Sequence, residues 1–386
     1  MHFLHITNHC GTTRNIQNVF SFLGLSDLVT ETCAFPTHIT ETHADQIWED
    51  YRSRDYPSKF QTLIFTDTSM YARPFLQHIE DHSMNLVIYV TNRFDWGAWH
   101  VHDAAYHGLY AERSRHPRVF FLADNRYDQF YASVTHGILF RNDDIFRLTP
   151  NISQNYSEET QEKIMIHNSK LFIYNRGTFF HLYGHFLPFS PQEYDIYGHN
   201  GYSRYNDEYH ISEYLGFLHL PYQTNIQSLW ENLGHGIIYF IPSKTFLKEL
   251  IQEPWYYWEE KCKSPELCAS SVDLAEWYQD ENAEYFVYFD SWNDLKVQRD
   301  HFLENNSAIY YKKKQISTKL EESNVIQLAK WRDLFLSLVF SPPSVENLDS
   351  REEEEENIES REEEEENIEL REEKDSPIIP QEDATV

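Results

Sequence analysis

The stretch from residue 217 to 243, FLHLPYQTNIQSLWENLGHGIIYFIPS, constrains the fold of this chain more than any other. Two apolar runs, at residues 217–220 and 237–241, have the length and residue types of buried strands. Between them four apolar residues recur at the spacing of one helix face: Ile226, Leu229, Trp230 and Leu233. A strand, a helix and a second strand in this order predict a parallel sheet.

Polar residues mark both ends of this predicted helix. Thr224 or Asn225 is the expected N-cap, and Gly234 is the expected stop. Ser228 and Glu231 continue the polar face that begins at Thr224. Because a helix that follows a parallel strand points its N-terminus at the ligand edge of a sheet, this end is a candidate site for an anionic or hydroxyl-rich ligand. A capped helix with a solvated polar face is the alternative.

The same alternation of strands and helices runs through most of the chain. Further strands are expected at residues 3–7, 62–65, 86–90, 119–122, 171–174, 194–197 and 285–289. Each of the first four precedes a polar turn and a helix-length segment, as in residues 8–25 and 123–134. This pattern predicts an α/β fold with two doubly wound, Rossmann-like parallel sheets.

Length and composition divide the chain into three segments. About 340 residues are too many for one hydrophobic core, so two domains are expected, at residues 1–150 and 151–340, joined by a polar linker near residues 149–169. Residues 341–386 carry 19 acidic and 4 basic residues and repeat SREEEEENIE with a ten-residue period. Such a segment buries little apolar surface, so we expect a disordered acidic tail, which is a candidate for binding a basic partner.

Charge and cysteine content exclude several classes of protein. The net charge is −30, and half of it lies outside the tail, which argues against binding nucleic acid because phosphates require a basic surface. The four cysteines are scattered without any CxxC pair, which predicts reduced thiols. The first ten residues, MHFLHITNHC, do not resemble a signal peptide, and no apolar run reaches 18 residues. We therefore expect a cytoplasmic protein without a membrane span.

Given this arrangement, the chain resembles the GT-B class of nucleotide-sugar-dependent glycosyltransferases. The resemblance covers residues 1–300 as architecture, and its specific part is LPYQTNIQSLWENLGHGIIYFIPS. In that class an acidic residue on a helix, followed by a glycine and an apolar strand, holds the ribose of the nucleotide. Glu231 occupies the position of the acid, and Gly234 or Gly236 that of the glycine. Many retaining members carry a second glutamate eight residues earlier, where this chain has Gln223.

The resemblance implies a metal-independent transferase with no cofactor and a donor bound to the second domain. Positive side chains and helix N-termini would then stabilise the departing diphosphate. Arg176 and Gly177 follow an expected strand, where a guanidinium fork and a close backbone suit a phosphate. Gly201 lies in a second polar loop. An ordinary turn is the alternative for both loops. With these residues we group Gln223, Asn225, Ser228 and Glu231 as the donor site.

The first domain offers candidates for the base that deprotonates the acceptor. Asp67 and Asp95 each lie just beyond an expected strand, on the side where the cleft would form. Asp95 is surrounded by residues that suit a sugar acceptor, namely Asn92, Arg93 and Trp96. Asp124 is a third candidate of the same kind, ranked lower because its neighbours resemble a helix start. For each aspartate a helix cap or turn is the competing interpretation.

The segment WHVHDAAYH superficially resembles a metal motif. His100 and His102 would share a face only in an extended segment, whereas Asp103 and His107 belong to a sequence typical of a helix start. We therefore expect a helix start and no metal site.

Three functions fit these observations. The favoured one is a hexosyl- or pentosyltransferase that moves a sugar from a nucleotide-sugar donor to a glycan or small-molecule acceptor. The second is another transferase of the same two-domain plan, such as a pyruvyl-type enzyme. The third is a catalytically inactive binding or scaffold protein, which Gln223 supports because a retaining enzyme often has glutamate there.

Overall fold

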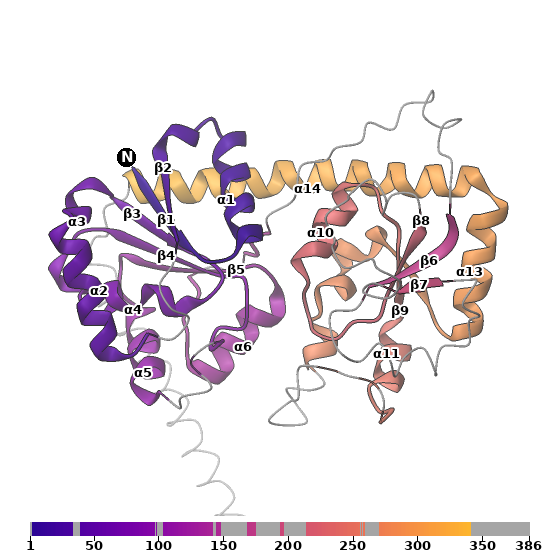
Figure 1. Cartoon of the computed structure of the whole chain (residues 1–386), viewed down its shortest axis with the longest axis horizontal. Helices are drawn as coiled ribbons and strands as arrows, with labels where there is room; N and C mark the ends of the chain where they lie inside the picture. Colours follow the sequence, from indigo (N-terminus) through magenta and orange to yellow (C-terminus); the bar gives the residue numbers. More distant parts are fainter. Residues whose placement is uncertain are drawn as a thin grey trace, which may run out of the picture. The chain divides into compact units, whose positions relative to one another are not determined.

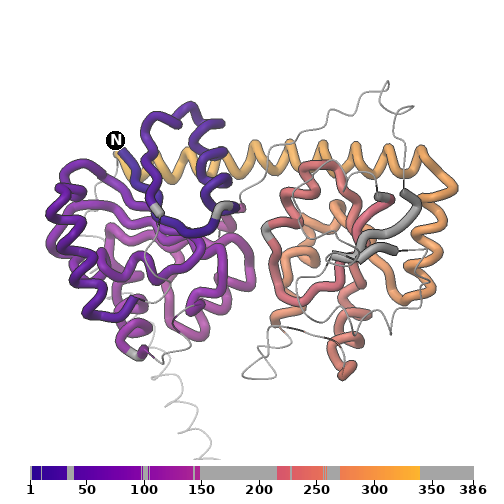
Figure 2. Tube along the Cα trace, in the orientation of Figure 1, coloured from indigo at the N-terminus to yellow at the C-terminus, as the bar shows by residue number. Residues whose placement is uncertain are grey.

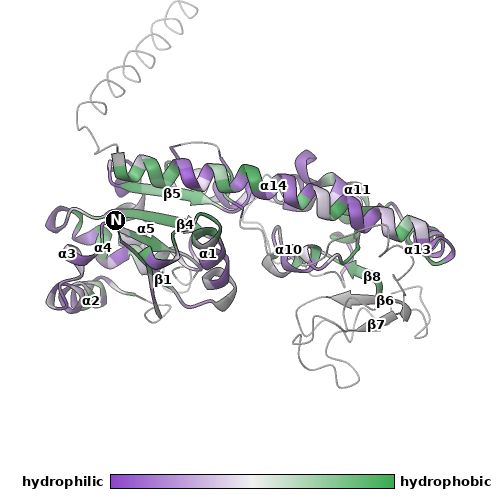
Figure 3. Cartoon of the chain, turned by 90° about the horizontal axis from the view of Figure 1, so that it is seen from above, coloured by the Kyte–Doolittle hydropathy of each residue, from purple (hydrophilic) through white to green (hydrophobic). Residues whose placement is uncertain are grey.

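The first half of the chain forms a parallel sheet around strands that are apolar on both faces. The computed structural model describes residues 2–33, 39–96, 98, 103–141, 144–147, 168–174, 194–196, 214–254, 256, 258 and 270–340. The first sheet consists of β1 (Phe3–Thr7), β2 (Val29–Cys33), β3 (Thr62–Phe65), β4 (Asn85–Val90) and β5 (Val119–Ala123). Its strand order is β2-β1-β3-β4-β5, and every neighbouring pair is parallel. Buried β-branched and aromatic residues are typical of such strands, and Figure 3 shows β4 and β5 in the hydrophobic colour.

Helices connect these strands (Figure 1). They are α1 (Cys10–Phe22), α2 (Glu41–Ser53), α3 (Tyr56–Lys59), α4 (Arg73–Gln77), α5 (Ala104–Arg113) and α6 (Arg126–His136). Short 3-10 turns add η1 (Ser26–Leu28), η2 (Ser69–Ala72) and η3 (Ile79–Asp81). The helix ends follow from local chemistry. Asn125 caps α6 by accepting from the Asp128 N–H at 2.9 Å, and Gly137 ends it with a left-handed backbone, φ 66°.

A second parallel sheet repeats this order in the second half of the chain. It contains β6 (Asn168–Tyr174), β7 (Tyr194–Ile196), β8 (Tyr214–His219), β9 (Tyr239–Pro242) and β10 (Phe286–Phe289), ordered β7-β6-β8-β9-β10. The helical elements here are α10 (Gln227–Gly234), α11 (Lys244–Leu250), η4 (Glu276–Tyr278), η5 (Asp280–Tyr285), α13 (Trp292–Glu304) and α14 (Asn306–Phe340). In each sheet the strand that comes first in sequence, β1 or β6, therefore lies between the two strands that follow it in sequence.

Alternate residues of the first sheet pack into two separate cores. Leu63 and Phe65 of β3 join a cluster with α2, α4 and α5, whereas Ile64 joins a cluster with α1. This division follows from the two-residue period of a strand. The second half has its own core around β8, β9 and β10, centred on fully buried side chains such as Phe240 and Trp277.

The long helix α14 contributes to the cores of both halves. Its early residues, Ile316 and Leu320 among them, pack in the core of the second half. Its last turns place Trp331 and Phe335 against the first sheet, beside Phe3 and Phe20 of β1 and α1. Figure 2 follows this helix at the yellow end of the colour scale. Residues up to Val339 form one compact unit, and the expected domain boundary at residue 150 stays a prediction.

Most of the expected elements are confirmed, with two exceptions. The α/β class, both parallel sheets and the nine expected strands are present with boundaries shifted by a few residues. The strand β2 was not expected, because VTETC places three consecutive polar residues between Val29 and Cys33 and so lacks both an apolar run and an alternating pattern. The helix α14 was not expected either. The linker near residues 149–169 lies almost entirely outside the described residues, and the acidic tail lies wholly outside them. No described helix is long and apolar enough to cross a membrane.

The predicted N-cap of the opening helix was wrong. The N-cap of α10 is Ile226, one or two residues later than expected, and Thr224 is fully buried rather than part of a solvated face. The helix ends at Gly234, as expected, and the left-handed residue that follows it is Gly236, φ 72°. The N-cap differs because the Glu276 carboxyl, far along the chain, accepts from the Ile226 N–H at 2.8 Å.

Candidate functional site

The carboxyl ends of β1 and β3 lie side by side in the first sheet. The strands pair in parallel from Phe3 opposite Thr62 to Ile6 opposite Phe65. Because β2 lies on one side of β1 and β4 on the far side of β3, the chain leaves these two strands in opposite directions. Such a switch point leaves a crevice outside the strand ends, where α/β proteins bind ligands.

Asp67 lies at this switch point in an unusual backbone conformation. Its φ is 74°, in the left-handed region that residues other than glycine seldom adopt. The Asp67 N–H donates to Thr91 Oγ1 at 3.0 Å, which fixes the turn to the end of β4. Burial raises the pKa of the half-buried carboxyl, and nearby His9 opposes that rise. A left-handed backbone and a raised carboxyl pKa at one position make Asp67 a candidate functional residue.

His9, which follows β1, is a neighbour that sequence reasoning missed. It is the N-cap of α1, and its ring Nδ1 accepts from the Gly11 N–H at 3.2 Å. With Nδ1 acting as the acceptor, the neutral ring carries its proton on Nε2 and can donate from there. The signal was present in the sequence, because His9 and Asp67 each follow a strand of the same parallel sheet.

Trp96 lies in the loop beside Asp67. The Thr68 hydroxyl donates to the Trp96 carbonyl at 3.0 Å, which connects the loops after β3 and β4. The Trp96 side chain is 38% exposed. An exposed indole in a loop bonded to the residue after Asp67 offers an apolar face of the kind that suits a sugar ring.

Asp95 lies in the interior rather than at this edge. It is 5% exposed, and its Oδ2 accepts from the Tyr131 hydroxyl at 2.9 Å. His136 Nε2 lies 3.5 Å from the same oxygen. Both partners belong to α6, so the described contacts of Asp95 hold this helix against the loop after β4. Asp124 is half-buried, accepts from the Tyr89 hydroxyl at 2.8 Å and has a pKa raised by burial to about 6.

Arg93 connects the loops of the two sheets. Its guanidinium pairs with the fully buried carboxylate of Asp128 and lies 4.8 Å from the centre of the Tyr127 ring. Its NH2 group donates to Thr224 Oγ1 at 3.2 Å, across to the segment after β8. The Arg93 N–H donates to Asn92 Oδ1 at 2.9 Å, so the two expected acceptor residues form one turn.

Asn225 makes the second contact between these loops. Its side-chain amide donates to Asp128 Oδ2 at 3.0 Å, and its carbonyl accepts from the Gln223 side chain at 2.7 Å. Asp128, which was not predicted, therefore binds both Arg93 and Asn225. Ser228 and Glu231 are half-buried on α10. Arg93 and Asp128, which follow β4 and β5, consequently meet the segment after β8 at Thr224 and Asn225.

Several expected residues lie outside the described part of the chain. These are Arg176, Gly177, Gly201, His100 and His102. Asp103 caps α5 by accepting from the Tyr106 N–H at 3.0 Å, which confirms the predicted helix start. Among the described residues, no group of three His, Cys, Asp or Glu side chains is arranged to hold a metal ion.

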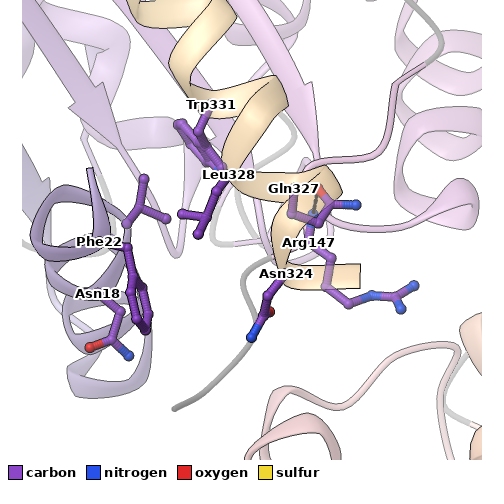
Figure 4. Close-up of a pocket in the computed structure, with 8 residues that line it drawn as sticks. Asn18, Phe22, Arg147, Asn324, Gln327, Leu328 and Trp331 are labelled. Carbon is purple, nitrogen blue, oxygen red and sulfur yellow. Dashed lines mark hydrogen bonds between the residues drawn. The ribbon is translucent and has the colours of Figure 1, made fainter. Parts of the chain in front are cut away.

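A hollow between α1 and α14 is separate from these residues (Figure 4). Its lining consists of Asn18, Val19, Phe22, Arg147, Asn324, Gln327, Leu328 and Trp331. The view shows the Phe22 and Trp331 rings from the two helices on its sides, with the Gln327 side chain bonded to the Arg147 backbone. None of the residues expected from the sequence lines this hollow.

Comparisons with known proteins bear on the fold. No protein-family model matches the chain, and no curated protein sequence is similar to it. The crystal structure of a glycosyltransferase from Rickettsia africae ESF-5 has a similar fold, with a TM-score of 0.57. The match covers 88% of this chain and 99% of that chain at 7% sequence identity. At this identity the similarity defines an α/β architecture of parallel sheets.

Proposed function

We propose that this chain is a glycosyltransferase of GT-B architecture that transfers a sugar from a nucleotide-sugar donor to a glycan or small-molecule acceptor. The observation that carries the proposal is Asp67, a half-buried carboxyl with a raised pKa and left-handed backbone at the switch point of the first sheet. Its loop lies on the same edge as the Arg93 and Asp128 contacts to the second half. The similar fold of a known glycosyltransferase supports the same class.

Asp67 is the proposed general base. Its carboxylate takes the proton of the acceptor hydroxyl while the hydroxyl oxygen bonds to the anomeric carbon of the donor. The bond from that carbon to the diphosphate breaks, and its electron pair leaves with the nucleoside diphosphate. A single displacement of this kind inverts the anomeric carbon. Trp96 supports the acceptor ring, and His9 donates from Nε2 to the carboxylate or the acceptor. Asp95, buried against Tyr131, is left with a supporting role.

The donor is proposed to bind the second half. Glu231 holds the ribose hydroxyls, with Ser228, Asn225 and Gln223 as neutral partners. Arg176, Gly177 and Gly201 remain proposals for the diphosphate. Stabilising the diphosphate with side chains and backbone N–H groups requires no metal ion.

Donor hydrolysis and transfer over a panel of nucleotide sugars, in a metal chelator, test this function. The wild type is expected to cleave at least one donor. Asp67→Asn is expected to lower that rate by about 10²- to 10⁴-fold, the usual range for a general base. Asp45→Asn, an exposed aspartate of α2, is the control and should leave the rate unchanged.

The pH dependence of the transfer rate is a second test of Asp67 as the base. A base works only when ionised, and its pKa is raised, so activity should fall as the pH decreases through that raised value. A rate that needs added manganese or magnesium would contradict metal independence. Full activity of Asp67→Asn would remove Asp67 as the base, and transfer of a pyruvyl group would favour the other transferase class.

A further inference from the structure

A single carboxylate holds the first turn of α10 from a distant part of the chain. Glu276 Oε1 accepts from the Ile226 N–H at 2.8 Å, and its Oε2 accepts from the Trp230 indole N–H at 2.7 Å. The Glu276 N–H also donates to the Thr224 carbonyl at 3.0 Å. The three hydrogen bonds of Glu276 therefore fix the turn from Thr224 to Trp230, which contains Ser228 and precedes Glu231.

The first half of the chain reaches this same turn through Arg147. Residues 144–147 lie against β5, where the Phe146 N–H donates to the Ala123 carbonyl at 2.9 Å. The Arg147 guanidinium lies 3.8 Å from the centre of the Trp230 ring. Its NH1 group donates to Asn282 Oδ1 at 2.8 Å, and the Asn282 amide donates to the Glu276 carbonyl at 2.6 Å. Arg147 thus contacts the ring that Glu276 also holds.

These groups are buried, so their charges act strongly on one another. Glu276 is 1% exposed and Arg147 is 7% exposed. Burial raises the pKa of Glu276 to about 8; the Arg147 charge opposes this rise and the Asp124 charge adds to it. Other ionisable groups around this cluster are the Tyr89 phenol, which donates to Asp124, the Tyr285 phenol, whose ring centre lies 5.4 Å from that of the Trp230 ring, and Asp128, whose charge acts on Asp124.

We propose that Glu276 is a positioning residue for the donor segment from Gln223 to Glu231, and that Arg147 connects its position to the first half of the chain. This inference rests on the proposed function. Glu276 acts through Thr224, Ile226 and Trp230 rather than by touching the donor.

The two protonation states of Glu276 have different consequences for a diphosphate. The neutral acid keeps one carbonyl oxygen as an acceptor for the turn and places no charge at the N-terminus of α10. The ionised carboxylate adds a buried negative charge to that turn and opposes the positive end of the helix dipole. Donor affinity should therefore decrease as the pH rises through the pKa of Glu276.

Calorimetric titration of uridine and guanosine diphosphates at pH 7 and pH 9 tests this inference. The wild type is expected to bind at least about fivefold more weakly at pH 9, the lower end of ordinary coupling between sites. Glu276→Gln keeps the length and shape of the side chain and one acceptor oxygen, as in the neutral acid, but has no ionisable group, and it should lose this pH dependence. Asp273→Asn is the control, because Asp273 precedes η4 but pairs with surface Lys248 at 2.7 Å.

Hydrogen exchange at the Ile226 amide gives a second readout that needs no ligand. Glu276→Ala should speed this exchange, whereas Asp273→Asn should not. Nucleotide ionisation affects every protein equally, so only the difference between variants counts. If the wild type and Glu276→Gln show the same pH dependence, or if Glu276→Ala leaves Ile226 protected, the inference is overturned and the proposed function stands. If the wild type binds no nucleoside diphosphate at either pH, the proposed function fails and this inference fails with it.

Discussion

Tyr71 shows how closely polar groups are packed around Asp67. Its side chain is fully buried, and its hydroxyl makes no hydrogen bond of ordinary geometry to a described residue, although the Asn8 side chain lies near it. Burial raises the pKa of this phenol, the nearby Asp67 charge adds to the rise, and Asn8 opposes it. A buried hydroxyl without a partner is destabilising, and such groups are often retained where substrate binds.

Tyr71→Phe should therefore not destabilise the protein. Removing an unpaired buried hydroxyl is expected to raise the free energy of unfolding by up to about 1 to 3 kcal/mol. Tyr110→Phe is the matched control, because the Tyr110 hydroxyl donates to the Ser69 carbonyl at 2.5 Å and its loss should lower stability. Urea unfolding of both variants measures the difference. An equal loss in the two variants would show that the Tyr71 hydroxyl has a partner.

Glu231→Ala should weaken donor binding without affecting folding. A hydrogen bond to a charged group is worth about 1.5 to 3 kcal/mol, and one to a neutral hydroxyl about 0.5 to 1.5 kcal/mol. Ser228→Ala should therefore weaken binding less than Glu231→Ala. Calorimetry with the preferred nucleoside diphosphate compares both variants with the wild type. Equal affinities in all three proteins would leave α10 without a role in donor binding.

At the scale of single elements, β8 depends on a close approach of backbones. A Cβ atom on Gly216 would lie 2.6 Å from the Ile238 carbonyl oxygen and 2.8 Å from the Phe240 ring. The carbonyl belongs to a hydrogen bond, because the Phe217 N–H donates to it at 2.7 Å. Since β8 leads directly into the segment from Gln223 to Ile226, a displaced strand would also displace the candidate site.

Two alanine substitutions should accordingly have opposite effects. Gly216→Ala is expected to destabilise by about 1 to 3 kcal/mol, the usual range for overpacking a core. Gly108→Ala in α5 meets nothing within 4 Å and should stabilise by roughly 0.5 to 1 kcal/mol, because alanine favours a helix over glycine. Thermal unfolding of the two variants measures both signs. An unchanged melting temperature for Gly216→Ala would show that β8 and β9 can move apart without a loss of stability.

At the scale of the whole molecule, buried ionisable groups predict how stability varies with pH. Burial raises the pKa of Glu276 to about 8 and lowers that of His82 to about 4. Between pH 4 and 6.5 the unfolded chain holds the His82 proton more firmly, so this group makes stability rise with pH. Between pH 4.5 and 8 the folded chain holds the Glu276 proton, so stability falls as the pH rises. Asp124 acts in the same direction up to about pH 6.

Of these three groups only Glu276 still titrates above pH 6.5, so its effect on stability can be measured there. The melting temperature of the wild type should fall between pH 6.5 and 8, and Glu276→Gln should remove this fall. Above pH 8 the sign reverses, because burial lowers the pKa of Lys312 and Lys313 to about 8 and their protons then favour the unfolded chain. Parallel melting curves of wild type and Glu276→Gln across this range would contradict the raised pKa of Glu276.

The sequence by itself determined the two parallel sheets and most of their strands. An apolar run such as residues 86–90 predicts a strand buried on both faces, and the spacing from Ile226 to Leu233 predicts a helix. Both patterns can be read from sequence because they involve only residues a few positions apart. Candidate residues such as Asp67 and Arg93 followed from the same reasoning, since parallel strands end at one edge. The strand β2 was missed because its local pattern is mixed.

Only the tertiary structure decided how those residues are used. It placed Asp95 inside against Tyr131 and left Asp67 at the switch point beside His9. It capped α10 with Glu276, 50 residues away, and joined Arg93 to Thr224 over 131 residues. It also packed the end of α14 on the first sheet. Local periodicity carries no information about these contacts, because pairs so distant in sequence are selected by how the sheets and helices pack, and their chemistry exists only after the chain has folded.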